Sequence, residues 1–155
     1  IHRIDYETSG LVLFCKHPFF QAYCDKNMEE HHIKKDYIAL VQGHTNYKNK
    51  KIVSNIARDR HNAKKMIIHP NGKESISIFN TLKNYKDCSL IQVTILTGRK
   101  HQIRVQCASL NHPILNDPLY GGKRIDNTGL LLQSHHIQFN DIDITCPQEK
   151  RFIRK

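Results

Sequence analysis

Residues 74–97, E-S-I-S-I-F-N-T-L-K-N-Y-K-D-C-S-L-I-Q-V-T-I-L-T, contain two candidate strands joined by a short polar turn. The strand candidates are 74–83 and 88–97, and both contain Ile and Thr, which strands favour. The turn between them, N-Y-K-D, holds the Asn and Asp that turns favour. This stretch therefore predicts sheet structure with short connections in the middle of the chain.

The same pattern extends outward from these residues. Two further strand candidates, 52–57 and 63–69, come before residues 74–97. The turn-forming stretch R-D-R-H-N separates these two candidates, and H-P-N-G separates the second of them from 74–83. Outside the 74–97 stretch, the expected strands are Gly10–Cys15 (short and buried), 36–42 (closing on Gly43), 52–57, 63–69, 130–139 and 142–146. The basic stretch 44–51 is expected to be a loop.

Two helices are expected between the strands. One covers 17–32, with Pro18 at its first position. The other covers 101–110, with Ile103 and Cys107 on one face, and a structured loop over 111–129 follows it. Many strands with short turns and two inserted helices indicate an α+β fold built on a mixed, largely antiparallel sheet.

The 155-residue chain is long enough to form one domain with its own core. Apolar residues make up 39% and charged residues 25%, which is ordinary for a soluble protein. The apolar runs are much shorter than the ~20 residues of a membrane-spanning helix, and no secretory signal pattern opens the sequence. We therefore expect no membrane association and a cytoplasmic location.

Five cysteines and eleven histidines raise the question of disulfides or a metal. An odd number of cysteines without a C-x-x-C pair favours reduced thiols over a disulfide framework or a thiolate zinc site. The adjacent pairs His31-His32 and His135-His136 lack the i, i+4 spacing of a helical zinc motif. We expect no metal, and a histidine-dependent metal nuclease is an alternative that rests on the histidine count alone.

The formal net charge of +10 predicts partners that are polyanions, because such an excess supports contacts to phosphates. A merely solubilising basic surface is the alternative. The basic residues gather in two groups, which favours the first interpretation. The groups are Lys48, Lys50 and Lys51, and then Arg58, Arg60, Lys64 and Lys65.

The opening residues, H-R-I-D-Y-E-T-S-G, are the first candidate site. His2, Arg3 and Asp5 lie within four positions, and Thr8 follows among loop-forming residues. A structural ion pair at the entrance to a strand and a catalytic loop are both consistent with this pattern.

A second candidate site is T-G-R-K-H-Q-I-R, residues 97–104, where a strand turns at Gly98 into a helix. Arg99, Lys100 and His101 gather beside the free N–H groups and positive dipole of a helix start, which predicts a phosphate site. Arg104 lies at the margin of the apolar face, where it is placed to pair with a partly buried carboxylate. A basic turn facing solvent is the alternative.

Four segments in this order resemble the signatures of the RluA-type RNA pseudouridine synthases. They are H-R-I-D-x-x-T-S-G-L-V-L, Y-I-A-L-V-Q-G, T-G-R-K-H-Q-I-R-V-Q and H-P-I-L-N-D-P-L-Y-G-G, and the resemblance covers essentially the whole chain. It implies isomerisation of uridine to pseudouridine in structured RNA, without a cofactor. Ribosomal RNA is the first expected substrate and transfer RNA the second.

The resemblance also implies roles for individual residues. Asp5 matches the catalytic aspartate, as nucleophile or as base, and Arg104 matches the arginine that pairs with it. Tyr37 matches the tyrosine that stacks on the uracil and is the proposed proton acceptor. Arg3 matches the arginine that fills the space left by the flipped uridine. The further RNA contacts expected from the residues are His2, Thr8, Arg58, Lys64, Lys65, Arg99, Lys100 and His101.

The chain departs from the family pattern in two places. Family members carry further strands before H-R-x-D, and often a separate RNA-binding domain, so residues 1–155 are expected to be an N-terminally truncated catalytic domain. The family also usually has a His where Gln133 stands. A non-catalytic RNA-binding domain is therefore the alternative function. The oligomeric state is not predicted.

Overall fold

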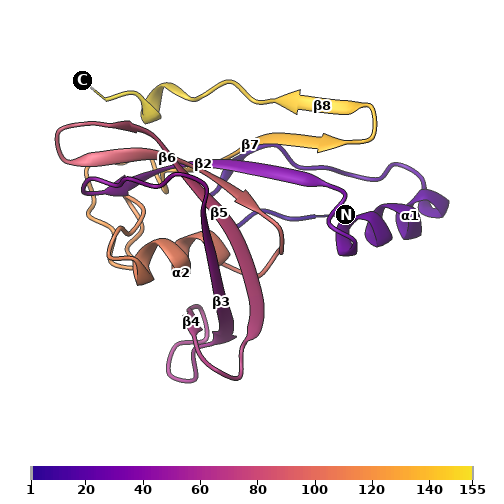
Figure 1. Ribbon diagram of the computed structural model, residues 1–155, viewed down its shortest axis with the longest axis horizontal. Helices are drawn as coiled ribbons and strands as arrows, with labels where there is room; N and C mark the ends of the chain where they lie inside the picture. Colours follow the sequence, from indigo (N-terminus) through magenta and orange to yellow (C-terminus); the bar gives the residue numbers. More distant parts are fainter. Residues whose placement is uncertain (1, 155) are drawn as a thin grey trace.

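The computed structural model describes residues 2–154, and Ile1 and Lys155, the two ends of the domain expected over 1–155, lie outside the described residues. The strands are β1 (Ser9–Gly10), β2 (Lys34–Gln42), β3 (Lys50–Arg58), β4 (Met66–Ile68), β5 (Lys73–Asn84), β6 (Cys88–Ile95), β7 (Leu132–Phe139) and β8 (Ile142–Thr145). The helices are α1 (Pro18–Glu29), α2 (Gln102–Ser109) and a 3-10 turn, η1 (Lys150–Phe152) (Figure 1).

The eight strands within residues 2–154 form one sheet, in the order β1-β7-β2-β6-β5-β3-β4, and β8 pairs with the second half of β7. The strands β5 and β6 form the hairpin expected from 74–97, with Ser77 opposite Ile95 at one end and Asn84 opposite Ser89 at the other. Every pairing is antiparallel except that of β1 with β7. The expected α+β class with a mixed, largely antiparallel sheet is confirmed.

The core lies around the central strands β2 and β6. The β2 residues from Lys35 to Val41 are all buried, so neither face of this strand meets solvent. The expected loop over 111–129 covers it through Ile114 and Leu115, and the Leu115 N–H donates to the Leu40 carbonyl at 2.9 Å. Burial of each such side chain contributes about 1.5–3 kcal/mol. The helix α2 adds Ile103 to the same core.

The expected short strand over Gly10–Cys15 is wrong. Only Ser9 and Gly10 pair with the sheet, and after the Leu11 N–H has donated to the Ser134 carbonyl at 3.0 Å the chain leaves it. Gly10 has a left-handed φ of 101°, which turns the backbone away, and a Cβ there would lie 2.1 Å from the Ser134 carbonyl oxygen. Leu11, Leu13 and Cys15 pack against the outer end of β7 and α1, where only part of their surface is buried, and Phe14 is exposed.

Other boundaries differ by a few residues. Lys50 and Lys51 belong to β3 and not to the expected loop over 44–51. The helix α1 ends at Glu29, three residues before the expected end, because His31 takes a left-handed φ of 61°. Pro18 does begin this helix. No helix within residues 2–154 is long and apolar enough to cross a membrane.

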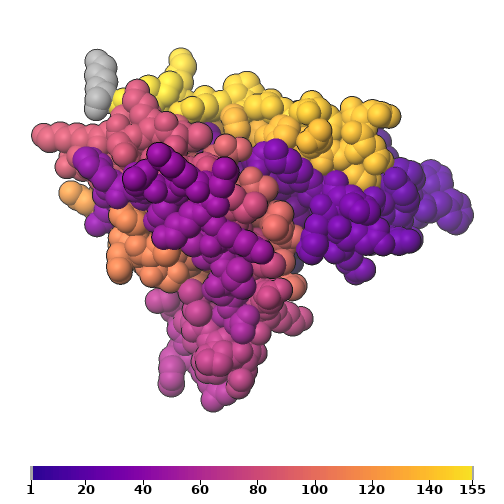
Figure 2. Space-filling view, in the orientation of Figure 1, coloured from indigo at the N-terminus to yellow at the C-terminus, as the bar shows by residue number. Residues whose placement is uncertain are grey.

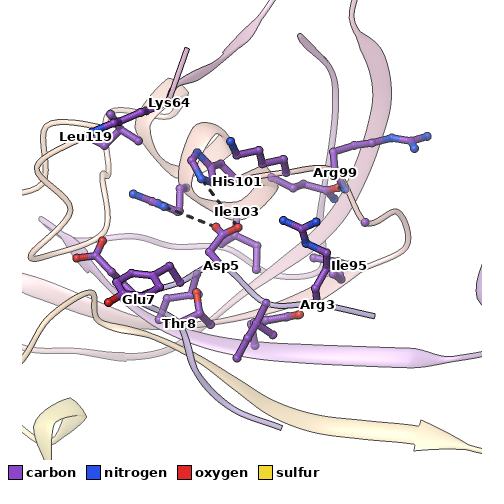
Figure 3. Close-up of a pocket in the computed structure, with 18 of the residues that line it drawn as sticks. Arg3, Asp5, Glu7, Thr8, Lys64, Ile95, Arg99, His101, Ile103 and Leu119 are labelled. Atoms are coloured by element: carbon purple, nitrogen blue, oxygen red, sulfur yellow. Dashed lines mark hydrogen bonds and ion pairs between the residues drawn. The ribbon is translucent and has the colours of Figure 1, made fainter. Parts of the chain in front are cut away.

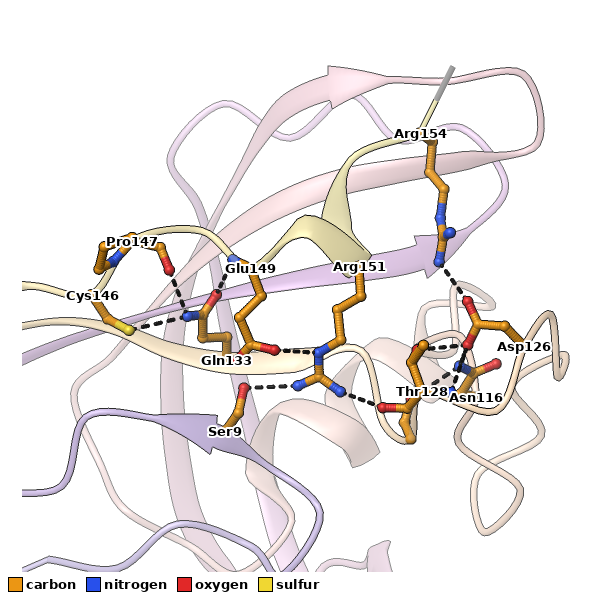
Figure 4. Close-up of polar contacts among 11 residues, drawn as sticks. Ser9, Asn116, Asp126, Thr128, Gln133, Cys146, Pro147, Glu149, Arg151 and Arg154 are labelled. Carbon is orange, nitrogen blue, oxygen red and sulfur yellow. Dashed lines mark hydrogen bonds and ion pairs between the residues drawn. The ribbon is translucent and has the colours of Figure 1, made fainter.

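The C-terminal segment contacts Ser9 of β1 (Figure 4). Arg151 donates to the Ser9 hydroxyl at 2.8 Å and to the Thr128 carbonyl at 2.6 Å. Gln133, the position that departs from the family, is fully buried and donates to the Pro147 carbonyl at 2.9 Å. Gln133 therefore holds the C-terminal segment on β7 and lies outside the lining of the cleft described below.

The ends of β3 and β5, together with β4, project from the rest of the molecule (Figures 1 and 2). Tyr120, in the loop after α2, packs with Ile56 of β3 and Val105 of α2 at the base of this projection. The Tyr120 hydroxyl accepts a hydrogen bond from the Met66 N–H at 2.9 Å. This contact fixes the position of β4, and with it the basic residues 58–65, relative to α2.

Candidate active site

A cleft of about 790 Å³ opens between the N-terminal loop and the start of α2 (Figure 3). Residues 3–8 form one wall and residues 98–104 the other. Tyr37 of β2 lies in the lining, and Lys64 reaches it from the β3–β4 connection. Segments far apart in the sequence thus meet around one concave surface.

Asp5 lies in this cleft beside Arg104. The Arg104 Nη1 is 3.7 Å from Asp5 Oδ2, and the Asp5 side chain keeps 22% of its surface exposed while Arg104 keeps 6%. The two other donors of the guanidinium are bound by Asp117, with Nε and Nη2 each 2.8 Å from a carboxylate oxygen. Asp117 is fully buried, so it holds the guanidinium rigidly and leaves Nη1 for Asp5.

His101 lies on the other side of Asp5. Its Nε2 is 4.0 Å from Asp5 Oδ1, and its Nδ1 is 2.8 Å from the Tyr120 hydroxyl oxygen. His101 has a left-handed φ of 54° at the residue before α2, and this backbone turn directs its ring into the cleft. Burial lowers the pKa of His101, and the nearby Arg104 and Lys100 lower it further against the opposing effect of Asp5.

The turn into α2 is held by Gln102. Its Oε1 accepts hydrogen bonds from the Thr97 hydroxyl at 2.8 Å and from the Arg99 N–H at 3.0 Å. Its Nε2 donates to Ser77 of β5 at 2.8 Å. The turn that carries Arg99, Lys100 and His101 is therefore tied to the sheet.

Tyr37 lies in the lining of the cleft, but its side chain is not in the deprotonated form that a general base requires. It is buried, and burial raises its pKa to about 12, with Asp5 adding to the rise against the opposing effect of Ser134. The phenol is therefore protonated at neutral pH. A flat ring in the lining of the cleft is suited to stacking on a base.

Known proteins match both the sequence and the fold. The family model for RNA pseudouridylate synthase matches residues 1–109. This chain belongs to that family. It is 40% identical to a ribosomal large subunit pseudouridine synthase C of Buchnera aphidicola over 98% of this chain and 53% of that protein. It is 34% identical to a ribosomal large subunit pseudouridine synthase D of Borreliella burgdorferi over 99% of this chain and 47% of that protein.

A solved structure agrees with these matches. The human RNA pseudouridylate synthase domain containing 1 superposes with a TM-score of 0.85 at 25% identity, over 95% of this chain and 67% of the human chain. This chain spans about half the length of the curated relatives it matches. The fold is thus that of an RNA pseudouridylate synthase over nearly the whole chain.

Most residues that the sequence suggested for the RNA pseudouridylate synthase site line the cleft. Those that do are Arg3, Asp5, Thr8, Tyr37, Lys64, Arg99, Lys100, His101 and Arg104. The Thr8 hydroxyl is buried and has no hydrogen-bond partner within residues 2–154. Arg104 is more deeply buried than its expected place at the margin of the apolar face.

His2, Arg58 and Lys65 lie outside the lining. Both ring nitrogens of His2 are buried, and burial and the neighbouring Lys35 lower its pKa to about 4. Arg58 donates to the Ala63 carbonyl at 3.2 Å, and the Lys65 ammonium lies 5.7 Å from the centre of the Tyr120 ring. RNA contacts by these three residues remain predictions.

The sequence did not indicate two residues of the site, Asp117 and Tyr120. Both belong to N-D-P-L-Y-G-G, part of the expected loop over 111–129, for which the residue types alone predict no chemical role. A signal was present, because a charged residue and an aromatic within a Gly-ended turn are candidates for contacts with other elements.

Within residues 2–154 no group of three or more His, Cys, Asp or Glu side chains is arranged to hold a metal ion.

Proposed function

We propose that this protein isomerises uridine to pseudouridine in structured RNA, with Asp5 as its catalytic carboxylate and without a cofactor. The reaction breaks the bond between N1 of uracil and the ribose, turns the freed base, and joins its C5 to the ribose. The C5 proton leaves and N1 gains one, so the product is an isomer. The observation that carries the proposal is Asp5 in an open cleft, 3.7 Å from Arg104.

The roles follow from position in the cleft. Asp5 acts on the ribose, as nucleophile on its anomeric carbon or as base toward the neighbouring proton. Arg104 orients this carboxylate, and the Tyr37 ring stacks on the uracil. Arg3 fills the space that the flipped nucleotide leaves, because the reacting atoms cannot be reached inside folded RNA. The raised pKa of Tyr37 supports stacking over its alternative role as acceptor of the C5 proton.

The proposed substrate is ribosomal RNA, with transfer RNA as the second choice, and residues 1–155 form the catalytic domain. Two similar proteins are named as ribosomal large subunit pseudouridine synthases, which supports this order. The net charge of +10 and the cationic residues Arg99, Lys100 and Lys64 in the cleft support binding to phosphates. All five cysteines are free, in keeping with a place in the cytoplasm.

The test is release of tritium from RNA labelled at C5 of uridine. Large-subunit ribosomal RNA and transfer RNA transcripts are incubated with the wild-type protein, Asp5→Asn and a control, Asp141→Asn, whose carboxylate is outside the cleft. We expect release by wild type and by Asp141→Asn, and a loss of about 1000-fold or more for Asp5→Asn, because the reacting group itself is removed. RNA affinity of Asp5→Asn is expected to stay near that of wild type.

Equal release by Asp5→Asn and wild type would contradict the catalytic role of Asp5. Tight RNA binding by wild type without release from either RNA would favour the non-catalytic RNA-binding domain. Binding itself is expected to weaken about tenfold or more when salt rises several-fold, since a few phosphates are neutralised.

A further inference from the structure

The Tyr120 hydroxyl lies between a donor and a ring nitrogen. The Met66 N–H donates to its oxygen at 2.9 Å, and the same oxygen is 2.8 Å from His101 Nδ1. A backbone N–H only donates, so the single proton of the hydroxyl is available to His101. When Tyr120 donates to Nδ1, a neutral His101 carries its own proton on Nε2.

The surroundings of His101 favour this neutral form. The ring is largely buried, with 10% of the side chain exposed. Arg104 and Lys100 of the same segment disfavour a positive charge there, while Asp5 and Asp117 from the two facing loops favour it. Burial and the two cations dominate, and the pKa of His101 is lowered.

The Nε2 proton then faces Asp5. The His101 Nε2 is 4.0 Å from Asp5 Oδ1 (Figure 3). The Arg104 Nη1 is 3.7 Å from Oδ2, so each carboxylate oxygen has its own N–H group on one side. Both distances exceed those of a hydrogen bond, and such distances in a free enzyme often shorten when substrate binds.

We propose that His101 is a positioning residue, which holds the Asp5 carboxylate through its Nε2–H, and that the Tyr120 hydroxyl selects the tautomer that makes this contact. This proposal rests on the proposed function, since it assigns a purpose to the orientation of Asp5. The tautomer of His101 is a property of the free protein, and it is tested without RNA.

The first test is the tautomer of His101, from long-range ¹H–¹⁵N spectra of protein labelled in histidine. His101→Gln identifies the signals of this residue. We expect a neutral ring protonated on Nε2 at neutral pH, and a mixture of tautomers in Tyr120→Phe, which keeps the ring and loses the hydroxyl. Tyr23→Phe, which removes a hydroxyl on α1 outside the cleft, is the control and should leave the signals unchanged.

A pH titration of the same signals tests the contact with Asp5. Asp5→Asn removes the negative charge that favours protonation, so the pKa of His101 should fall further. A protonated ring at neutral pH, an Nδ1–H tautomer in wild type, or no change in Tyr120→Phe would overturn the proposal.

The second test compares His101→Gln with His101→Met in single-turnover conversion of C5-tritiated ribosomal RNA. The two side chains have similar length and meet the same left-handed backbone, but only Gln carries an N–H donor near the place of Nε2. We expect Met to lower the rate about tenfold or more and Gln to retain most of it, with RNA affinity equal in both.

Equal rates for the two variants would overturn the positioning role. If wild type itself converts no RNA, the proposed function and the role of His101 in it are both overturned, whereas the spectra still decide the tautomer. Failure of the positioning role and failure of the proposed function are thus distinguishable.

Discussion

His101 and His136 both lie beside aspartates, but the protein shifts their pKa values in opposite directions. His136 of β7 has Nδ1 2.9 Å from Asp36 of β2 and Nε2 2.9 Å from Asp143 of β8. Hydrogen bonds to Asp143 and then to Asp36 raise its pKa. His101 has one carboxylate near Nε2, at 4.0 Å, and its pKa is lowered.

The difference lies in what each ring nitrogen contacts. Both nitrogens of His136 face carboxylate acceptors, so both must donate, and only the imidazolium donates from both. His101 has a hydroxyl at Nδ1 and lies among the cations Arg104 and Lys100. A nearby aspartate does not by itself raise the pKa of a histidine. Direct hydrogen bonds to two aspartates raise the pKa, and burial next to cations lowers it.

The largest expected effect concerns the ion pair that supports the cleft. Asp117→Asn removes the charge that balances the buried Arg104, and we expect a loss of roughly 3–5 kcal/mol in the free energy of unfolding. Urea denaturation measures it. A double variant, Asp117→Leu with Arg104→Met, should lose less than the sum of the two single changes, because no uncompensated charge stays buried. A loss below about 1 kcal/mol in Asp117→Asn would show that the pair is not a rigid support.

The second prediction concerns the hydrogen bonds of His136 with Asp36 and Asp143. Asp36→Asn removes the charge that faces His136 and Lys34, and its Oδ1 also accepts from the Thr94 hydroxyl. We expect a loss of about 1–3 kcal/mol by urea denaturation. The control is Asp143→Asn, whose side chain is 62% exposed and should cost about 1 kcal/mol or less. Equal losses for the two variants would mean that the buried Asp36 contributes no more to stability than the exposed Asp143.

The smallest effect is a pair of opposite pH slopes in stability. The raised pKa of His136 means that its contribution is fully present below the unfolded value of 6.5 and is lost as pH rises through the folded pKa. The lowered pKa of His101 means that stability is lost as pH falls from 6.5 toward its folded pKa. Urea denaturation over a pH series should show the first slope vanish in His136→Gln and the second in His101→Gln. Slopes that persist in these variants would assign them to other groups.

The sheet could be predicted in large part because its signals are local. The β5–β6 hairpin shows in 74–97 as two apolar runs with a turn between them, and α2 shows as an apolar face after Gly98. The prediction failed at Gly10–Cys15, where an apolar run packs beside the sheet after a glycine has turned the chain out of it. An apolar run indicates burial and does not identify the layer in which it is buried.

For the site, the order of motifs along the chain indicated the family and suggested Asp5, Tyr37 and Arg104, and the structure places these three residues in one cleft. Only the tertiary structure decided that Asp117 binds Arg104, that Tyr120 bonds to His101, and that His136 lies one hundred residues from its partner Asp36. Periodicity, turn residues and motif spacing act over a few neighbouring residues. Partners of a buried charge are selected by how distant loops close on one another, and that closure sets the direction in which the pKa of each histidine shifts.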